Sequence, residues 1–173
     1  MGRLLVFTLA LVGCDPGGES APRGVEGRYQ IVARETRATC DAQAPWTPGM
    51  VDEPFFRLAP VTVVGTPLLG YFPCASADPG SCAEGPRLGL SYSERGGRWW
   101  SLTGNLRSGE AGCAMVMLAG PLEATADGLV LLLSHHEGVL DVPADACTVD
   151  VLEARFAELP CQDQIRWTAR RLD

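Results

Sequence analysis

Short segments in which apolar and polar residues alternate are the feature that most constrains the fold of this chain. In residues 25–34, for example, Tyr29, Ile31 and Ala33 alternate with polar side chains. Because successive side chains of a β-strand point to opposite faces, this alternation predicts a strand with one buried face. Further predicted strands are residues 54–59, 61–64, 68–72, 88–93, 98–103, 113–119, 122–125, 129–133 and 161–172. Turn signals such as Gly96-Gly97 and Asp127-Gly128 separate several of them.

One segment has the period of a helix. Apolar residues recur in residues 148–159 at spacings of three, four and three: Val149, Leu152, Phe156 and Leu159. Thr148 or Asp150 can cap the start, and Pro160 prevents the helix from continuing. Residues 129–133 are apolar on both faces of their strand, which predicts a cover on each side. We expect the interior of the β-structure on one side and this helix, or a loop, on the other.

The predicted fold class is therefore mostly β, a single antiparallel β-barrel or β-sandwich with one late α-helix. Gly27-Arg28-Tyr29, at the head of the first strand, resembles the Gly-x-Trp opening of lipocalin-like barrels, with Tyr in place of Trp. This resemblance implies a lipocalin-like meander, in which a helix precedes the last strand. A β-sandwich stapled by disulfides is the alternative.

Six cysteines in the part of the chain after residue 14 predict a disulfide framework. They are Cys40, Cys74, Cys82, Cys113, Cys147 and Cys161. An even number in an exported domain is typical of disulfides, and no Cys-x-x-Cys spacing supports a metal site. Local pairing is the preferred connectivity: Cys74 with Cys82 across a loop, Cys147 with Cys161 across the predicted helix, and Cys40 with Cys113.

The N-terminus predicts export and lipid attachment. Arg3 precedes an apolar stretch, residues 4–12, that is too short to span a bilayer. Leu11-Val12-Gly13-Cys14 resembles the lipobox of bacterial lipoproteins, which implies cleavage before Cys14 and acylation of that residue. We therefore expect a signal peptide (1–13), a lipidated cysteine with a flexible tether (14–24) and one β-rich domain (25–173). The expected location is the cell envelope, attached by lipid to the outer rather than the inner membrane.

The charge excludes some partners. All 14 basic residues are arginine, against 21 acidic residues, and removing the signal peptide with Arg3 leaves 13 − 21 = −8. No basic stripe is present, which argues against nucleic acid. The expected partners are the membrane, through the lipid, and an apolar small molecule or another envelope protein.

Only one patch has side chains that could perform chemistry. His135 and Glu137 share a strand face and form a weak candidate site for a divalent ion, or for acid–base work with Asp141. His136 points the other way. No nucleophile elbow or phosphate-binding glycine loop is present, and the sequence implies no cofactor or resident metal.

Four tryptophans are candidates for the lining of a ligand pocket: Trp46, Trp99, Trp100 and Trp167. Trp99 and Trp100 are adjacent, so in a strand they face opposite sides, and we expect one in the core. The predicted function is that of a non-enzymatic binding or interaction module. The alternative is an envelope hydrolase that uses the His/carboxylate patch.

Overall fold

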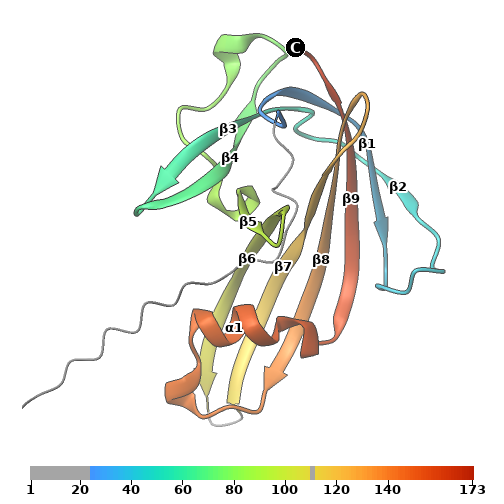
Figure 1. Cartoon of the computed structure of the whole chain (residues 1–173). Helices are drawn as coiled ribbons and strands as arrows, with labels where there is room; N and C mark the ends of the chain where they lie inside the picture. Colours follow the sequence, from blue (N-terminus) through green and yellow to red (C-terminus); the bar gives the residue numbers. More distant parts are fainter. Residues whose placement is uncertain (1–23, 110–111) are drawn as a thin grey trace, which may run out of the picture.

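The computed structural model describes residues 24–109 and 112–173 (Figure 1). The predicted signal peptide, Cys14 and most of the predicted tether lie outside these residues. Among the described residues the strands are β1 (Gly27–Arg37), β2 (Thr47–Gly49), β3 (Phe55–Val63), β4 (Thr66–Cys74), β5 (Tyr92–Arg95), β6 (Arg98–Gly109), β7 (Gly112–Ala124), β8 (Gly128–Leu140) and β9 (Cys161–Arg171). The α-helix is α1 (Val149–Arg155), and short 3-10 turns are Pro79–Ser81, Leu88–Leu90, Ala144–Ala146 and Phe156–Glu158.

Eight of these strands close into an antiparallel barrel. From β3 to β9 each strand pairs with the next one along the chain, β3 pairs with β1, and β1 pairs with β9 to complete the ring. The short β2 lies on the same edge of β1 as β3, further along the strand, at Arg34–Thr36. Closure of the ring decides between the two predicted architectures: the domain is a barrel and not a sandwich.

The seams of the barrel, where two neighbouring strands meet, differ in the number of residues that pair across them. β1 and β9 pair at eight positions, from Tyr29–Arg171 to Arg37–Gln164. β4 and β5 share one ladder pair, Leu69–Tyr92. Irregular bonds supplement that pair: the Arg87 N–H donates to the carbonyl of Tyr71, and the Tyr71 N–H donates to Ser91 Oγ.

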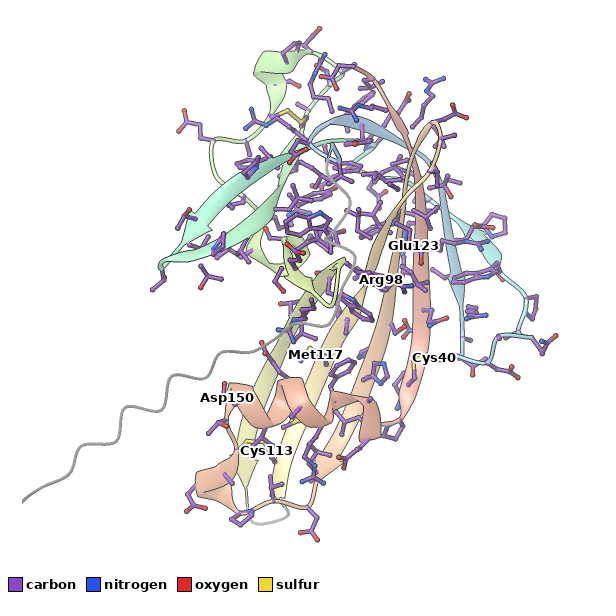
Figure 2. The ribbon with its side chains drawn as sticks, viewed as in Figure 1. Cys40, Arg98, Cys113, Met117, Glu123 and Asp150 are labelled. Carbon is purple, nitrogen blue, oxygen red and sulfur yellow. A yellow bond between two sulfur atoms is a disulfide. The ribbon has the colours of Figure 1, made fainter. Side chains whose placement is uncertain are left out.

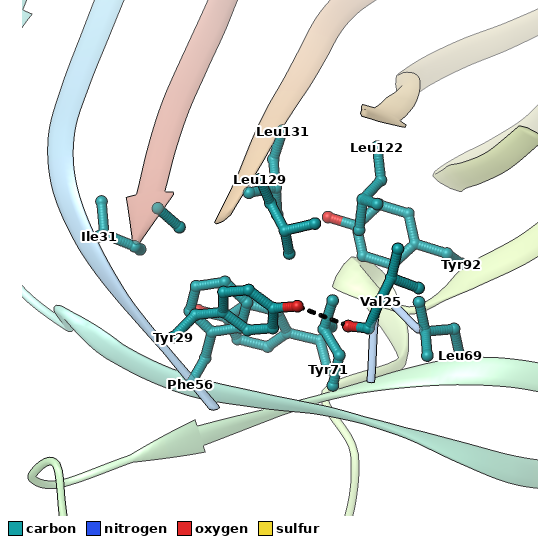
Figure 3. Packing of buried hydrophobic residues seen from close by; sticks show 12 residues of the cluster. Val25, Tyr29, Ile31, Phe56, Leu69, Tyr71, Tyr92, Leu122, Leu129 and Leu131 are labelled. Atoms are coloured by element: carbon teal, nitrogen blue, oxygen red, sulfur yellow. Dashed lines mark hydrogen bonds between the residues drawn. The ribbon is translucent and has the colours of Figure 1, made fainter. Parts of the chain in front are cut away.

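The interior of the barrel is filled by side chains (Figure 3). Tyr29, Phe56 and Tyr71 form an aromatic stack, with ring centroids 5.3 Å and 4.8 Å apart. The hydroxyl of Tyr29 donates to the carbonyl of Val25, so the buried phenol has a partner. Aliphatic residues complete this core: Val25, Ile31, Leu58, Leu69, Leu122, Leu129 and Leu131.

A second core lies on the opposite face of the long strands, beneath α1. Cys113, Met115, Met117 and Ala119 of β7 are buried there. They pack with residues from β8, from α1 and from the segment after it: Leu140, Val151, Phe156 and Leu159. Figure 1 shows α1 crossing the far halves of β6, β7 and β8, and Figure 2 labels Cys113 and Met117 in that region. The helix begins at a cap, in which Thr148 Oγ1 accepts from the Val151 N–H.

Both cores share β7, and the buried face changes along it. Cys113, Met115, Met117 and Ala119 face α1, whereas Leu122 faces the barrel interior. Gly120 lies at the change. A Cβ there would collide with the backbone carbonyl of Leu132 on β8, so the close approach of the two strands requires glycine.

The three disulfides join Cys40 to Cys161, Cys74 to Cys82, and Cys113 to Cys147. The predicted disulfide framework and the Cys74–Cys82 pair are confirmed. The Cys147–Cys161 and Cys40–Cys113 pairs are wrong. The reason is that α1 lies flat on the sheet, which brings its start to Cys113 on β7, while β1 and β9 bring Cys40 to Cys161.

Several strands are longer than predicted. β7 continues through Gly120-Pro121, because the β7–β8 ladder has no pair at these two residues, so the missing N–H of proline costs no ladder bond. β8 continues past the two histidines to Leu140. α1 and the residues directly after it cover the far end of β8, at His136 and Leu140, instead of residues 129–133 as predicted. Leu88–Leu90 forms a 3-10 turn where a strand was predicted, and β2 lies where no strand was predicted.

We predict that Gly120→Ala destabilises the domain by about 1–3 kcal/mol, because the added methyl group meets backbone and not a movable side chain. Gly85→Ala is the matched control, since a Cβ at Gly85 meets nothing within 4 Å. Urea unfolding of both variants measures the difference. Equal midpoints would contradict the close approach of β7 and β8.

We also predict which disulfide contributes more to the free energy of unfolding. In the chain-entropy model the Cys40–Cys161 bond, with a sequence separation of 121, stabilises by about 5 kcal/mol, and the Cys74–Cys82 bond, with a separation of 8, by about 2.6 kcal/mol. Replacing each pair by alanine should therefore lower the unfolding midpoint more for the first pair. Peptide mapping without reduction checks the connectivity, and a Cys147–Cys161 linked peptide would refute it.

Candidate functional site

A cavity of about 360 Å³ opens at one end of the barrel. We call it the mouth pocket. Its lining residues are Ile31, Arg34, Met50, Val51, Asp52, Glu53, Tyr71, Arg87, Leu90 and Trp167.

The floor of the mouth pocket is the barrel core itself. Ile31 and Tyr71 are buried members of that core, and Trp167 packs against it. One wall is the segment of residues 50–53 between β2 and β3, and another is formed by Arg87 and Leu90, between β4 and β5. The pocket therefore has an apolar and aromatic floor with charged side chains around it.

An ion pair joins the two walls. Arg87 Nη1 lies 2.7 Å from Glu53 Oε2, and Arg87 Nη2 lies 3.1 Å from Glu53 Oε1, which is a two-pronged contact. These hydrogen bonds lower the pKa of the Glu53 carboxyl. Burial raises the pKa of Tyr71 to about 12, so its hydroxyl on the pocket floor stays neutral at physiological pH. Both partners of the ion pair are exposed, and the pair orients the walls more than it stabilises the fold.

Arg34 has a different environment from Arg87. It lies opposite Trp167 of β9 and opposite Gly49 of β2, on the face of β1 that points to the pocket. Its side chain passes close over Gly49, where a Cβ would lie 2.6 Å from Arg34 Nη1. The absence of a side chain at Gly49 leaves the space that the guanidinium occupies.

The four tryptophans do not gather in one place. Trp167 lines the mouth pocket, as predicted. Trp99 packs against the barrel core and lines a separate open hollow of about 310 Å³ beside the β3–β4 hairpin. Trp100 is its neighbour on β6, and its side chain points to the opposite face of the sheet, which confirms the predicted divergence of this pair.

Trp46, a candidate pocket residue, does not line the mouth pocket and stacks with two arginines. The guanidinium of Arg37 lies 4.6 Å from its ring centroid, and that of Arg166 lies 4.4 Å from it. Arg166 also pairs with Glu35, at 2.7 Å. This stack packs the segment before β2 onto β1 and β9, on the outer side of the barrel.

His135 and Glu137 share a strand face, as predicted, and His135 Nε2 lies 3.7 Å from Glu137 Oε2. Asp163 of β9, which the sequence reasoning missed, is the closer partner: its Oδ2 lies 2.9 Å from His135 Nδ1. Asp141 is six residues along from His135, roughly 20 Å in extended chain, so its proposed role with this histidine is wrong. Within residues 24–109 and 112–173, no group of three potential metal-binding side chains occurs.

His136 lies on the other face of β8, beneath α1. Its Nδ1 lies 3.2 Å from the carbonyl oxygen of Leu159, and its ring meets Phe156 edge-on at 5.5 Å. This histidine belongs to the second core. The two adjacent histidines therefore have separate environments, as their positions in a strand predicted.

The sequence held a signal for one of the missed residues. Asp163 has the same strand parity as Ile165 and Trp167, which predicts that it shares their face. Arg34 also belongs to a predicted strand. The other residues that line the pocket with it, 50–53 and Arg87, lie in loops, and the alternation pattern does not predict the paths of loops.

In the described part of the chain, no helix has the length and hydrophobicity that crossing a bilayer requires. Comparison with known proteins gives no similarity: no protein-family model, no curated protein and no solved structure matches this chain significantly.

Proposed function

We propose that this chain is a lipid-anchored protein of the bacterial cell envelope and that its mouth pocket binds an apolar small molecule. The observation that supports binding is the pocket itself. Its volume of about 360 Å³ lies within the range of ligand sites, roughly 300–1,000 Å³. An apolar floor with a few charged groups at the edge is the usual composition of such sites.

The position of the pocket limits how the ligand would bind. Aromatic and aliphatic side chains fill the barrel interior below Ile31 and Tyr71, so a ligand would rest on the core and not enter it. Met50, with 75% of its surface exposed, and the half-buried Val51 would cover its sides. Burial of these side chains on binding would supply the affinity.

The proposed anchor suits this function. Acylation of Cys14 would hold the domain at a membrane, and residues 14–24, which are rich in glycine and proline, would serve as a short tether. Apolar molecules concentrate in and near membranes, so the pocket would meet its ligand there. The weak lipocalin-like resemblance of Gly27-Arg28-Tyr29 is compatible with this proposal.

We predict that the full chain binds the neutral apolar dye N-phenyl-1-naphthylamine and that Val51→Asp weakens this binding about tenfold, because a charge replaces an apolar wall. Val64→Asp is the matched control, since Val64 is fully exposed in the β3–β4 turn. Fluorescence titration of detergent-free protein, made in an oxidising cell-free extract, measures the affinity. Absence of saturable binding, or equal loss in both variants, would contradict the proposed site.

We predict that Cys14→Ala abolishes lipid attachment. In cells given radiolabelled palmitate, the wild-type chain should carry label and lack residues 1–13, whereas the variant should stay an unlabelled precursor. Asp15→Ala is the control and should be labelled normally. Label on the Cys14→Ala variant would exclude this cysteine as the anchor.

A further inference from the structure

We infer that the ligand of the mouth pocket carries a carboxylate and that Arg34 binds it. This inference rests on the proposed function and adds the chemical class of the ligand. It concerns the one arginine of the pocket that the fold leaves without a counter-charge.

The two arginines of the pocket differ in their partners. Arg87 is occupied by the two-pronged contact with Glu53. The side chain of Arg34 makes no hydrogen bond and no ion pair with any residue in the described ranges. A partly buried guanidinium has five N–H donors, and leaving them unpaired away from bulk water costs free energy. A ligand carboxylate would satisfy two of these donors in one planar contact.

Two neighbouring residues restrict the position of the Arg34 side chain. Its side chain crosses Gly49 at close range, and Trp167 is its register partner on β9. Both restrict the guanidinium to the pocket side of β1. Neighbouring arginines of β1 and β9 have partners within the protein: Arg37 donates a hydrogen bond to Gln164, and Arg166 forms an ion pair with Glu35.

The remaining charges agree with an anionic head group. Glu53 and Arg87 neutralise each other across the walls. Asp52 is exposed at the outer edge and makes no ion pair among the described residues, so it can remain hydrated when a ligand binds. Arg34, half-buried beside the apolar floor, is then the charge that a bound ligand would contact. An apolar body on the floor with a carboxylate at Arg34 fits this arrangement.

Displacement of the neutral dye tests the inference, with dodecanoate and 1-dodecanol as competitors of equal chain length. Dodecanoate should displace the dye at least about tenfold better than dodecanol, because charge-assisted hydrogen bonds to Arg34 are available to the acid alone. Arg34→Gln should remove this preference, so that dodecanoate and dodecanol displace the dye equally well. Arg170→Gln, which removes the same charge from the outer face of β9, should keep it.

Gly49→Ala is a second variant that leaves the charge in place. Its methyl group would meet the movable end of Arg34 and redirect the guanidinium, so the preference for the acid should fall while thermal unfolding stays near that of the wild type. Equal displacement by dodecanoate and dodecanol in the wild type would overturn the inference and leave the proposed function standing. Equal loss in Arg34→Gln and Arg170→Gln would also overturn it. Failure of the dye to bind would overturn both.

Discussion

The close contact of β7 and β8 at Gly120 is the constraint on which the rest of the structure depends. A strand in a one-sided sheet keeps its apolar residues on one face, but β7 buries odd-numbered residues before this point and Leu122 after it. The register of β7 against β8 is the same before and after Gly120, so the two cores lie on the two opposite faces of one continuous strand. Gly120 permits the close approach of β7 and β8 between the two cores.

This arrangement also explains where the pocket lies. α1 covers one face of the far halves of β6, β7 and β8 (Figure 1), and the mouth pocket lies at an end of the barrel where part of the interior face is accessible. At that end the floor is the apolar core, and the walls come from the irregular segments between β2 and β3 and between β4 and β5. The pocket thus has its apolar floor from the barrel core and its charged groups from a few loop and edge residues, Arg34 among them.

The fold class was predictable from the sequence, and the contacts at the site were only partly so. Alternation located most strands and the period of residues 148–159 located the helix, because both patterns report on burial within one element. The disulfide partners of Cys113 and Cys161 were not predictable, since they depend on where the helix lies on the sheet and which strands meet at closure. The contacts of Trp46 were not predictable for a related reason: an aromatic residue in a loop can stack on outward arginines as readily as it can line a pocket. The alternation pattern predicts the strand face on which Asp163 lies. Its pairing with His135 depends on the register of β8 against β9, which the pattern does not give.

The bond between Cys40 and Cys161 has a consequence for how the barrel can move. It lies just beyond the end of β1 and at the start of β9, the two strands whose pairing closes the ring. Separation of these strands is thus opposed by a covalent link as well as by their ladder. The seam with the fewest ladder pairs is between β4 and β5, directly beside the wall that carries Arg87 and Leu90. Separation of β4 from β5 would therefore break fewer ladder bonds than separation of any other neighbouring pair of barrel strands in the described residues.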